Sequence, residues 1–144
     1  MFKKDFFNSS QKEKIKKAIE TAELNTSGEI RVHVSKSCPE DALDCAAFWF
    51  EKLNMHKTEQ RNGVLFFLAT NERKFAILGD AGINTKVPND FWDNIKETVL
   101  ESFKNNLFAE GLEKGILMAG EQLKQHFPHQ KDDVNELSDD ISFG

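Results

Sequence analysis

The sequence has no tyrosine, only two cysteines and three prolines among its 144 residues, and no long apolar run. Cys38 and Cys45 form neither a CxxC nor part of a larger paired set, so the sequence predicts neither a zinc site nor a disulfide framework. Met1 is followed by charged residues instead of an apolar segment of about 7–15 residues, so we expect no secretory signal. No stretch approaches the ~20 apolar residues of a membrane span. The expected location is therefore the reducing cytoplasm.

Strong catalytic and nucleotide-binding signatures are also absent. The sequence contains no GxSxG, HExxH, GxGxxG or P-loop motif. Its net charge is -5 and its pI is about 5.4, and no basic patch dominates, so we expect no nucleic-acid partner. The acidic balance leaves cation binding open. We expect a monomer, with a protein partner as one of the alternatives below.

The composition that is present, 39% hydrophobic and 30% charged, is typical of one globular domain. We expect a lead-in over residues 1–9, a domain over residues 10–127 and a flexible acidic tail over residues 128–144. The tail "HQKDDVNELSDDISFG" lacks periodicity and has few large apolar residues. Gly111, Gly115 and Ala119 recur every four residues and predict close helix packing.

The hydrophobic periodicity predicts four helices and three strands. The first helix is expected at residues 10–24, where Ser10 and Glu13 match a capping box, and the second at residues 37–54. The third is expected to begin with Asn89 as its N-cap, and the fourth to cover residues 107–126. The segment "EIRVHVS" alternates strictly, which predicts a half-buried strand at residues 29–35. The apolar run at residues 63–69 predicts a strand buried on both faces, and residues 74–78 predict its hairpin partner.

The order α-β-α-β-β-α-α predicts a small α/β fold. A strand–helix–strand crossover makes strands 29–35 and 63–69 parallel, and the hairpin adds strand 74–78 antiparallel. Helices on both faces give a three-layer α/β/α sandwich with a mixed sheet, in a Rossmann-like arrangement. The strand at 29–35 is then an edge strand, and His33 is expected to be a solvated histidine on its outward face.

This topology brings three polar segments to one end of the sheet: "TSGE" at residues 26–29, "QRNG" at 60–63 and "GDAG" at 79–82. Carboxylate and amide oxygens suit calcium or magnesium. The candidate ligands are Asp80, Asn62, Glu29, Asn84, Asn89 and Asp90. In the alternative, Asp80 only caps a turn and Glu29 pairs with Arg61. A glycine-rich phosphate cradle is disfavoured because we expect no helix directly after Gly82.

Two further functions stay open. In a metal-assisted phosphomonoester hydrolase, Arg61 would orient the phosphate, Asp80 would bind the metal that activates water, and Asp90 would be the acid. In a metal-independent interaction domain, the N-terminal phenylalanines and the acidic tail would bind a protein partner.

Several short motifs resemble the TPM domain family. They are "SGEI" at residues 27–30, "NGVL" at 62–65, "GDAGI" at 79–83 and "AEGL" at 109–112, in the order and spacing typical of that family. The resemblance covers residues 10–127. It implies an α/β/α sandwich, divalent-cation binding in some members and acid phosphatase activity in a plant branch. Many bacterial members add a signal peptide and a membrane helix, which we do not expect here.

Overall fold

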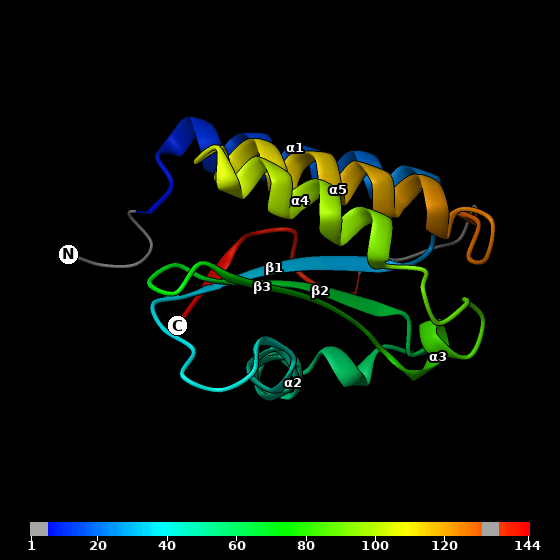
Figure 1. The fold of residues 1–144 in the computed structure, drawn as a ribbon. Helices are drawn as coiled ribbons and strands as arrows, with labels where there is room; N and C mark the ends of the chain where they lie inside the picture. The colour runs from blue at the N-terminus through cyan, green and yellow to red at the C-terminus, as the bar shows by residue number, and fades with distance from the viewer. Residues whose placement is uncertain (1–5, 131–135) are drawn as a thin grey trace.

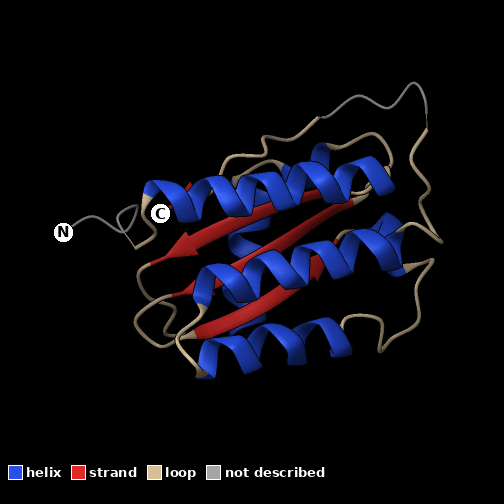
Figure 2. Ribbon diagram, turned by 90° about the horizontal axis from the view of Figure 1, so that it is seen from above, coloured by secondary structure: helices blue, strands red, loops and turns tan. Residues whose placement is uncertain are grey.

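The computed structural model describes residues 6–130 and 136–144. A four-stranded sheet lies between two layers of helices (Figure 1). Three long helices run side by side across one face (Figure 2): α1 (Ser9–Asn25), α4 (Asp93–Lys104) and α5 (Phe108–Leu123). The other face is covered by α2 (Ala42–Lys52), which the short 3-10 helix η2 (Met55–Lys57) follows. The predicted three-layer α/β/α sandwich is confirmed.

The sheet has the order β3-β2-β1-β4. Its strands are β1 (Glu29–Ser35), β2 (Gly63–Ala69), β3 (Lys74–Gly79) and β4 (Ser142–Phe143). As predicted, β1 and β2 are parallel and β3 is antiparallel to β2. All seven residues of β2 are buried, which agrees with its uninterrupted apolar sequence.

The described part of the predicted flexible tail packs against the domain. Ser142 and Phe143 of β4 pair in parallel with His33 and Val34 of β1, and Gly144 N donates to Val34 O at 3.1 Å. Residues 131–135 of the predicted tail lie outside the described residues. We had expected β1 to be an edge strand. This was wrong, because β4 pairs with its outer side.

His33 is fully buried, so the prediction of a solvated surface histidine was wrong. Its ring stacks on Trp49 of α2 with the centroids 4.0 Å apart, and its Nδ1 lies 2.7 Å from Ser142 Oγ. Burial lowers the pKa of His33 to about 4, so the imidazole is neutral at physiological pH. The histidine therefore belongs to the packing between β1, β4 and α2.

Two hydrophobic cores follow from the alternation of side chains along the strands. Val64, Phe66 and Leu68 face the core under α1, α4 and α5, whereas Leu65 and Phe67 face the core under α2. Strand β2 contributes no polar side chain to either core. The larger of the two fixes the position of the three long helices.

Helix boundaries differ from the predictions mainly at the N-termini. The capping box of α1 is made by Asn8 and Gln11 instead of Ser10 and Glu13. Helix α4 begins at Asp93 instead of near Asn89, because the preceding residues form turns.

The small-residue ridge of α5 confirms the predicted close packing. A Cβ atom added to Gly115 would lie 2.4 Å from Val99 of α4, and one added to Gly111 would lie 2.9 Å from Ser102. Helices α4 and α5 therefore approach more closely than larger residues would allow.

Candidate functional site

The three predicted polar segments meet at one end of the sheet. They are residues 26–29, 60–63 and 79–82, which we call the polar end of the sheet. Glu29 N donates to Asn62 O at 3.0 Å, and Asn62 Nδ2 donates to Ser27 O at 2.8 Å. Asp80 N donates to Gly63 O at 2.9 Å. The parallel and antiparallel pairings of β1, β2 and β3 thus place the segments in contact.

Asp80 caps a helix and forms an ion pair. Its carboxylate accepts two hydrogen bonds of 2.8 Å from Arg61 Nε and an Arg61 Nη nitrogen. It also accepts from Ala81 N at 2.7 Å and so caps α3 (Ala81–Asn84). The alternative prediction that Asp80 acts as a cap is therefore confirmed, whereas its pairing of Arg61 with Glu29 was wrong. The expectation that no helix begins here was also wrong, because α3 begins at Ala81.

Glu29 is buried, with 4% of its surface exposed, and it binds the C-terminal segment. Its Oε1 accepts from Glu136 N at 2.7 Å and from Leu137 N at 2.6 Å. Burial raises the pKa of Glu29 to about 7, and a side-chain hydrogen bond with the Glu136 carboxyl group acts in the same direction. Two acidic side chains from distant parts of the chain are thus held together.

A second acidic pair lies beside the first. Glu23 of α1 hydrogen-bonds Asp139 through their carboxyl groups, and Glu23 Oε2 accepts from Ile30 N at 3.2 Å. Burial, followed by the contact with Asp139, raises the pKa of Glu23 to about 9. The sequence analysis missed Glu23. One signal was available: Glu23 lies four residues after the buried Ile19, on the core-facing side of the helix.

The other predicted ligands are placed less closely together. Asn62 is buried, and its Oδ1 has no hydrogen-bond partner in the described part of the chain. Asn84 donates through Nδ2 to Gly79 O at 3.0 Å. Asn89 and Asp90 lie exposed in the turn before α4. Within residues 6–130 and 136–144, Glu29, Asp80 and Asp90 do not form a carboxylate cluster with metal-ligand spacing.

The opposite end of the sheet carries a disulfide bond that we had not expected. Cys38, in the loop after β1, is joined to Cys45 in the first turns of α2. The cysteines are seven residues apart, and the chain path after Pro39 brings them together. The prediction that the two cysteines form no disulfide framework was therefore wrong.

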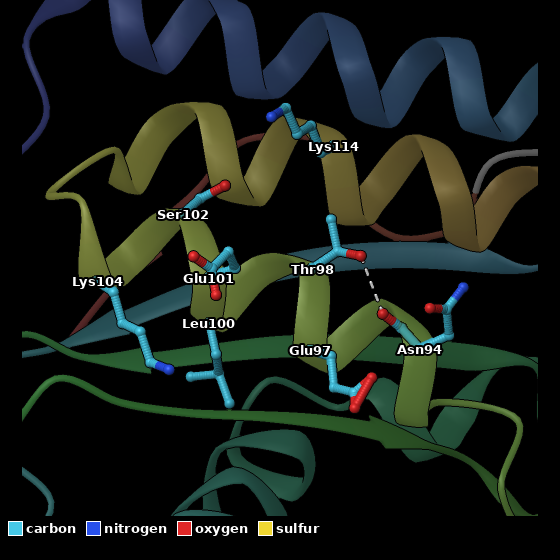
Figure 3. A pocket seen from close by; sticks show the side chains of 8 residues that line it. All are labelled: Asn94, Glu97, Thr98, Leu100, Glu101, Ser102, Lys104 and Lys114. Carbon is cyan, nitrogen blue, oxygen red and sulfur yellow. Dashed lines mark hydrogen bonds between the residues drawn. The ribbon is translucent and has the colours of Figure 1, made fainter.

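A groove of about 630 Å³ lies on the outer surface of α4 and α5 (Figure 3). It is lined by Asn94, Glu97, Thr98, Leu100, Glu101, Ser102, Lys104 and Lys114. None of these residues belongs to the polar end of the sheet. Thr98 Oγ1 donates to Asn94 O at 3.0 Å, a bond within the helix itself. The groove and the polar end are thus separate features.

The model of the TPM domain matches residues 2–122, and the chain belongs to this family. No curated protein matches the chain. The solved BA42 protein from the psychrophilic bacterium Bizionia argentinensis is 43% identical to it. That match covers 96% of each chain with a TM-score of 0.91.

Two more distant structures share the fold. The N-terminal domain of a P. gingivalis protein is 21% identical, with a TM-score of 0.64 over 86% of this chain and 81% of that one. The N-terminal domain of the cg2496 protein from Corynebacterium glutamicum is 14% identical, with a TM-score of 0.58 over 94% and 79%. Among the described residues, no helix has the length and apolar character needed to cross a membrane.

Proposed function

We propose that this TPM domain is a divalent-cation binding module, with the cation held at the polar end of the sheet. The observation that carries the proposal is the contact between acidic side chains there. Glu29 Oε1 accepts from Glu136 N at 2.7 Å and from Leu137 N at 2.6 Å, and the Glu136 carboxyl group lies against it. The salt bridges within residues 6–130 and 136–144 involve Glu110, Asp140 and Asp80, and none neutralises Glu29.

The Glu29–Glu136 pair needs a proton or a cation between its carboxyl groups, because two adjacent carboxylates in a poorly solvated site repel each other. A divalent ion supplies two positive charges and replaces the protons at neutral pH. Its ligands would be carboxylate oxygens of Glu29 and Glu136, with the unpartnered Asn62 Oδ1 as a candidate third oxygen. Calcium suits this set better than magnesium, since it accepts irregular oxygen shells.

The predicted ligand Asp80 has a different position in this proposal. Both of its carboxylate oxygens accept hydrogen bonds from Arg61, so metal coordination by Asp80 requires the arginine to move away. The same ion pair favours cation binding over phosphomonoester hydrolysis. In the hydrolase, Asp80 would bind the metal that activates water and Arg61 would orient the phosphate, so the two side chains would first have to separate.

An NMR titration of the ¹⁵N-labelled protein with calcium chloride, repeated with magnesium chloride, tests the proposal. We expect shifts at residues 26–29, 60–63 and 136–140 in wild type, weaker binding by at least about tenfold in Glu29→Gln, and wild-type binding in the exposed control Glu121→Gln. Unchanged spectra at millimolar calcium would refute cation binding. Loss of binding in Asp80→Asn but not in Glu29→Gln would move the site to Asp80.

A further inference from the structure

The loop between β1 and α2 holds three potential metal ligands of mixed chemistry. Cys38 is fully buried and Cys45 is 9% exposed, whereas Glu40 lies on the surface beside them. Cys45 Sγ lies 3.5 Å from Glu40 Oε1. The two sulfur atoms and a Glu40 carboxylate oxygen lie within 4.8 Å of one another, the only such group of His, Cys, Asp and Glu side chains in the described residues.

Contacts other than the disulfide also hold this loop in place. Lys74 Nζ donates to Cys38 O and to Glu40 O, both at 2.8 Å. Glu72 accepts from Cys38 N at 3.1 Å and from Ser37 Oγ at 2.6 Å. These bonds do not involve the sulfur atoms, so we expect them to persist when the disulfide is opened. We therefore expect the reduced loop to keep both thiols and the carboxylate close together.

The chemistry of this group changes with oxidation state. In the disulfide, each sulfur is bonded to the other and neither is a thiolate. A dithiol reductant transfers two electrons and two protons to the disulfide, which yields two cysteine thiols and one oxidised reductant disulfide. A metal ion then displaces the two thiol protons. Two thiolates with one carboxylate favour zinc-like ions over calcium or magnesium.

We propose that Cys38, Cys45 and Glu40 form a redox-gated site for a zinc-like ion, closed in the disulfide form and open after reduction. The site lies at the end of β1 opposite Glu29, so it is separate from the proposed calcium site. Positive charge favours the anionic sulfurs. Lys74 brings positive charge to this loop through its bonds to the Cys38 and Glu40 carbonyl oxygens, and Cys45 lies near the N-terminus of α2.

Cobalt(II), used alone as a spectroscopic substitute for zinc, tests this site in the full chain. The protein is reduced with a dithiol, desalted without oxygen and titrated beside the oxidised protein. We expect one cobalt ion per chain with a thiolate-to-cobalt charge-transfer band in the reduced protein and no band in the oxidised protein. Glu40→Gln should weaken binding at least about tenfold, whereas the exposed Glu51→Gln on α2 should bind like wild type.

Several results would overturn the proposal. One is the absence of a charge-transfer band in the reduced protein, and another is equal cobalt affinity in Glu40→Gln and Glu51→Gln. A band that persists in the Cys38→Ser/Cys45→Ser double variant would place the metal elsewhere. Circular dichroism of the reduced protein before metal addition checks the loop argument, because a loss of folded structure on reduction contradicts a site held ready by Lys74 and Glu72.

Discussion

Replacing Glu29 by glutamine should remove a pH-dependent loss of stability. Glu29 has a pKa of about 7 in the folded protein, whereas a glutamate outside this environment, as in the unfolded chain, has a pKa of 4.5. Between these values the folded state holds a proton that the unfolded state has released, so the free energy of unfolding falls as pH rises. Above pH 7 the loss is complete, and below pH 4.5 it is absent. Glutamine has no proton to release and keeps an oxygen that can accept from Glu136 N.

The size of the effect follows from the two pKa values. Their difference corresponds to about 3 kcal/mol, at about 1.4 kcal/mol for each tenfold change in proton affinity. Because Glu29 interacts with the Glu136 carboxyl group, the two groups share this energy, and 3 kcal/mol is its upper limit. We therefore expect Glu29→Gln to match wild type near pH 4.5 and to be more stable than wild type near pH 8, by up to about 3 kcal/mol.

Urea unfolding in a chelating buffer at several pH values between 4.5 and 8 measures this difference. The exposed Glu121→Gln serves as the control, since it changes the net charge equally without a buried contact. Calcium should reduce the advantage of Glu29→Gln at pH 8 if the ion replaces the proton. A wild-type stability that stays parallel to that of Glu29→Gln across the range would refute the reasoning.

Three further changes test other parts of the structure. Cys45→Ser removes the disulfide between residues seven apart and should lower the free energy of unfolding by about 2.4 kcal/mol in urea titrations under oxidising conditions. If the variant stays less stable than wild type after both proteins are reduced, the loss does not come from the disulfide. Gly82→Ala would place a Cβ atom 2.2 Å from Gln60 O, so we expect a loss of about 2–3 kcal/mol by thermal unfolding. The matched Gly28→Ala, whose nearest contact would be 3.4 Å, should change stability by less than about 1 kcal/mol, and equal losses would argue against the steric explanation. Arg61→Ala should lower the free energy of unfolding, because it leaves the buried Asp80 carboxylate without its cation. A double-mutant cycle with Asp80→Asn that gives no coupling energy would disprove this.

Local patterns were sufficient to predict most of the fold. The alternation of Ile30, Val32 and Val34 identified β1, and the unbroken apolar run identified β2. The crossover and the hairpin then required three polar segments to meet at one end of the sheet, which the contacts of Asn62 and Asp80 confirm. These inferences succeeded because side-chain period and strand direction depend on neighbours in the sequence.

The partners of individual polar side chains were less predictable. Arg61 binds Asp80 although Glu29 lies in the same group of segments, because the turn before α3 aims both Asp80 oxygens at the guanidinium. The disulfide was also missed, since seven residues of spacing permit many loop paths and only one brings Cys38 onto Cys45. Both contacts depend on orientations that no periodic pattern encodes.

The sequence alone determined the layers, the strand directions and the end of the sheet where polar residues gather. Only the tertiary structure decided how the C-terminal segment is used. It places β4 beside β1, buries His33 and joins Glu29 to Glu136, which is 107 residues away. The physical reason is that a short acidic segment carries almost no local structural preference. Its position is set by the uncovered edge of β1 and by the Glu29 carboxyl oxygen, which accepts hydrogen bonds from the Glu136 and Leu137 backbone.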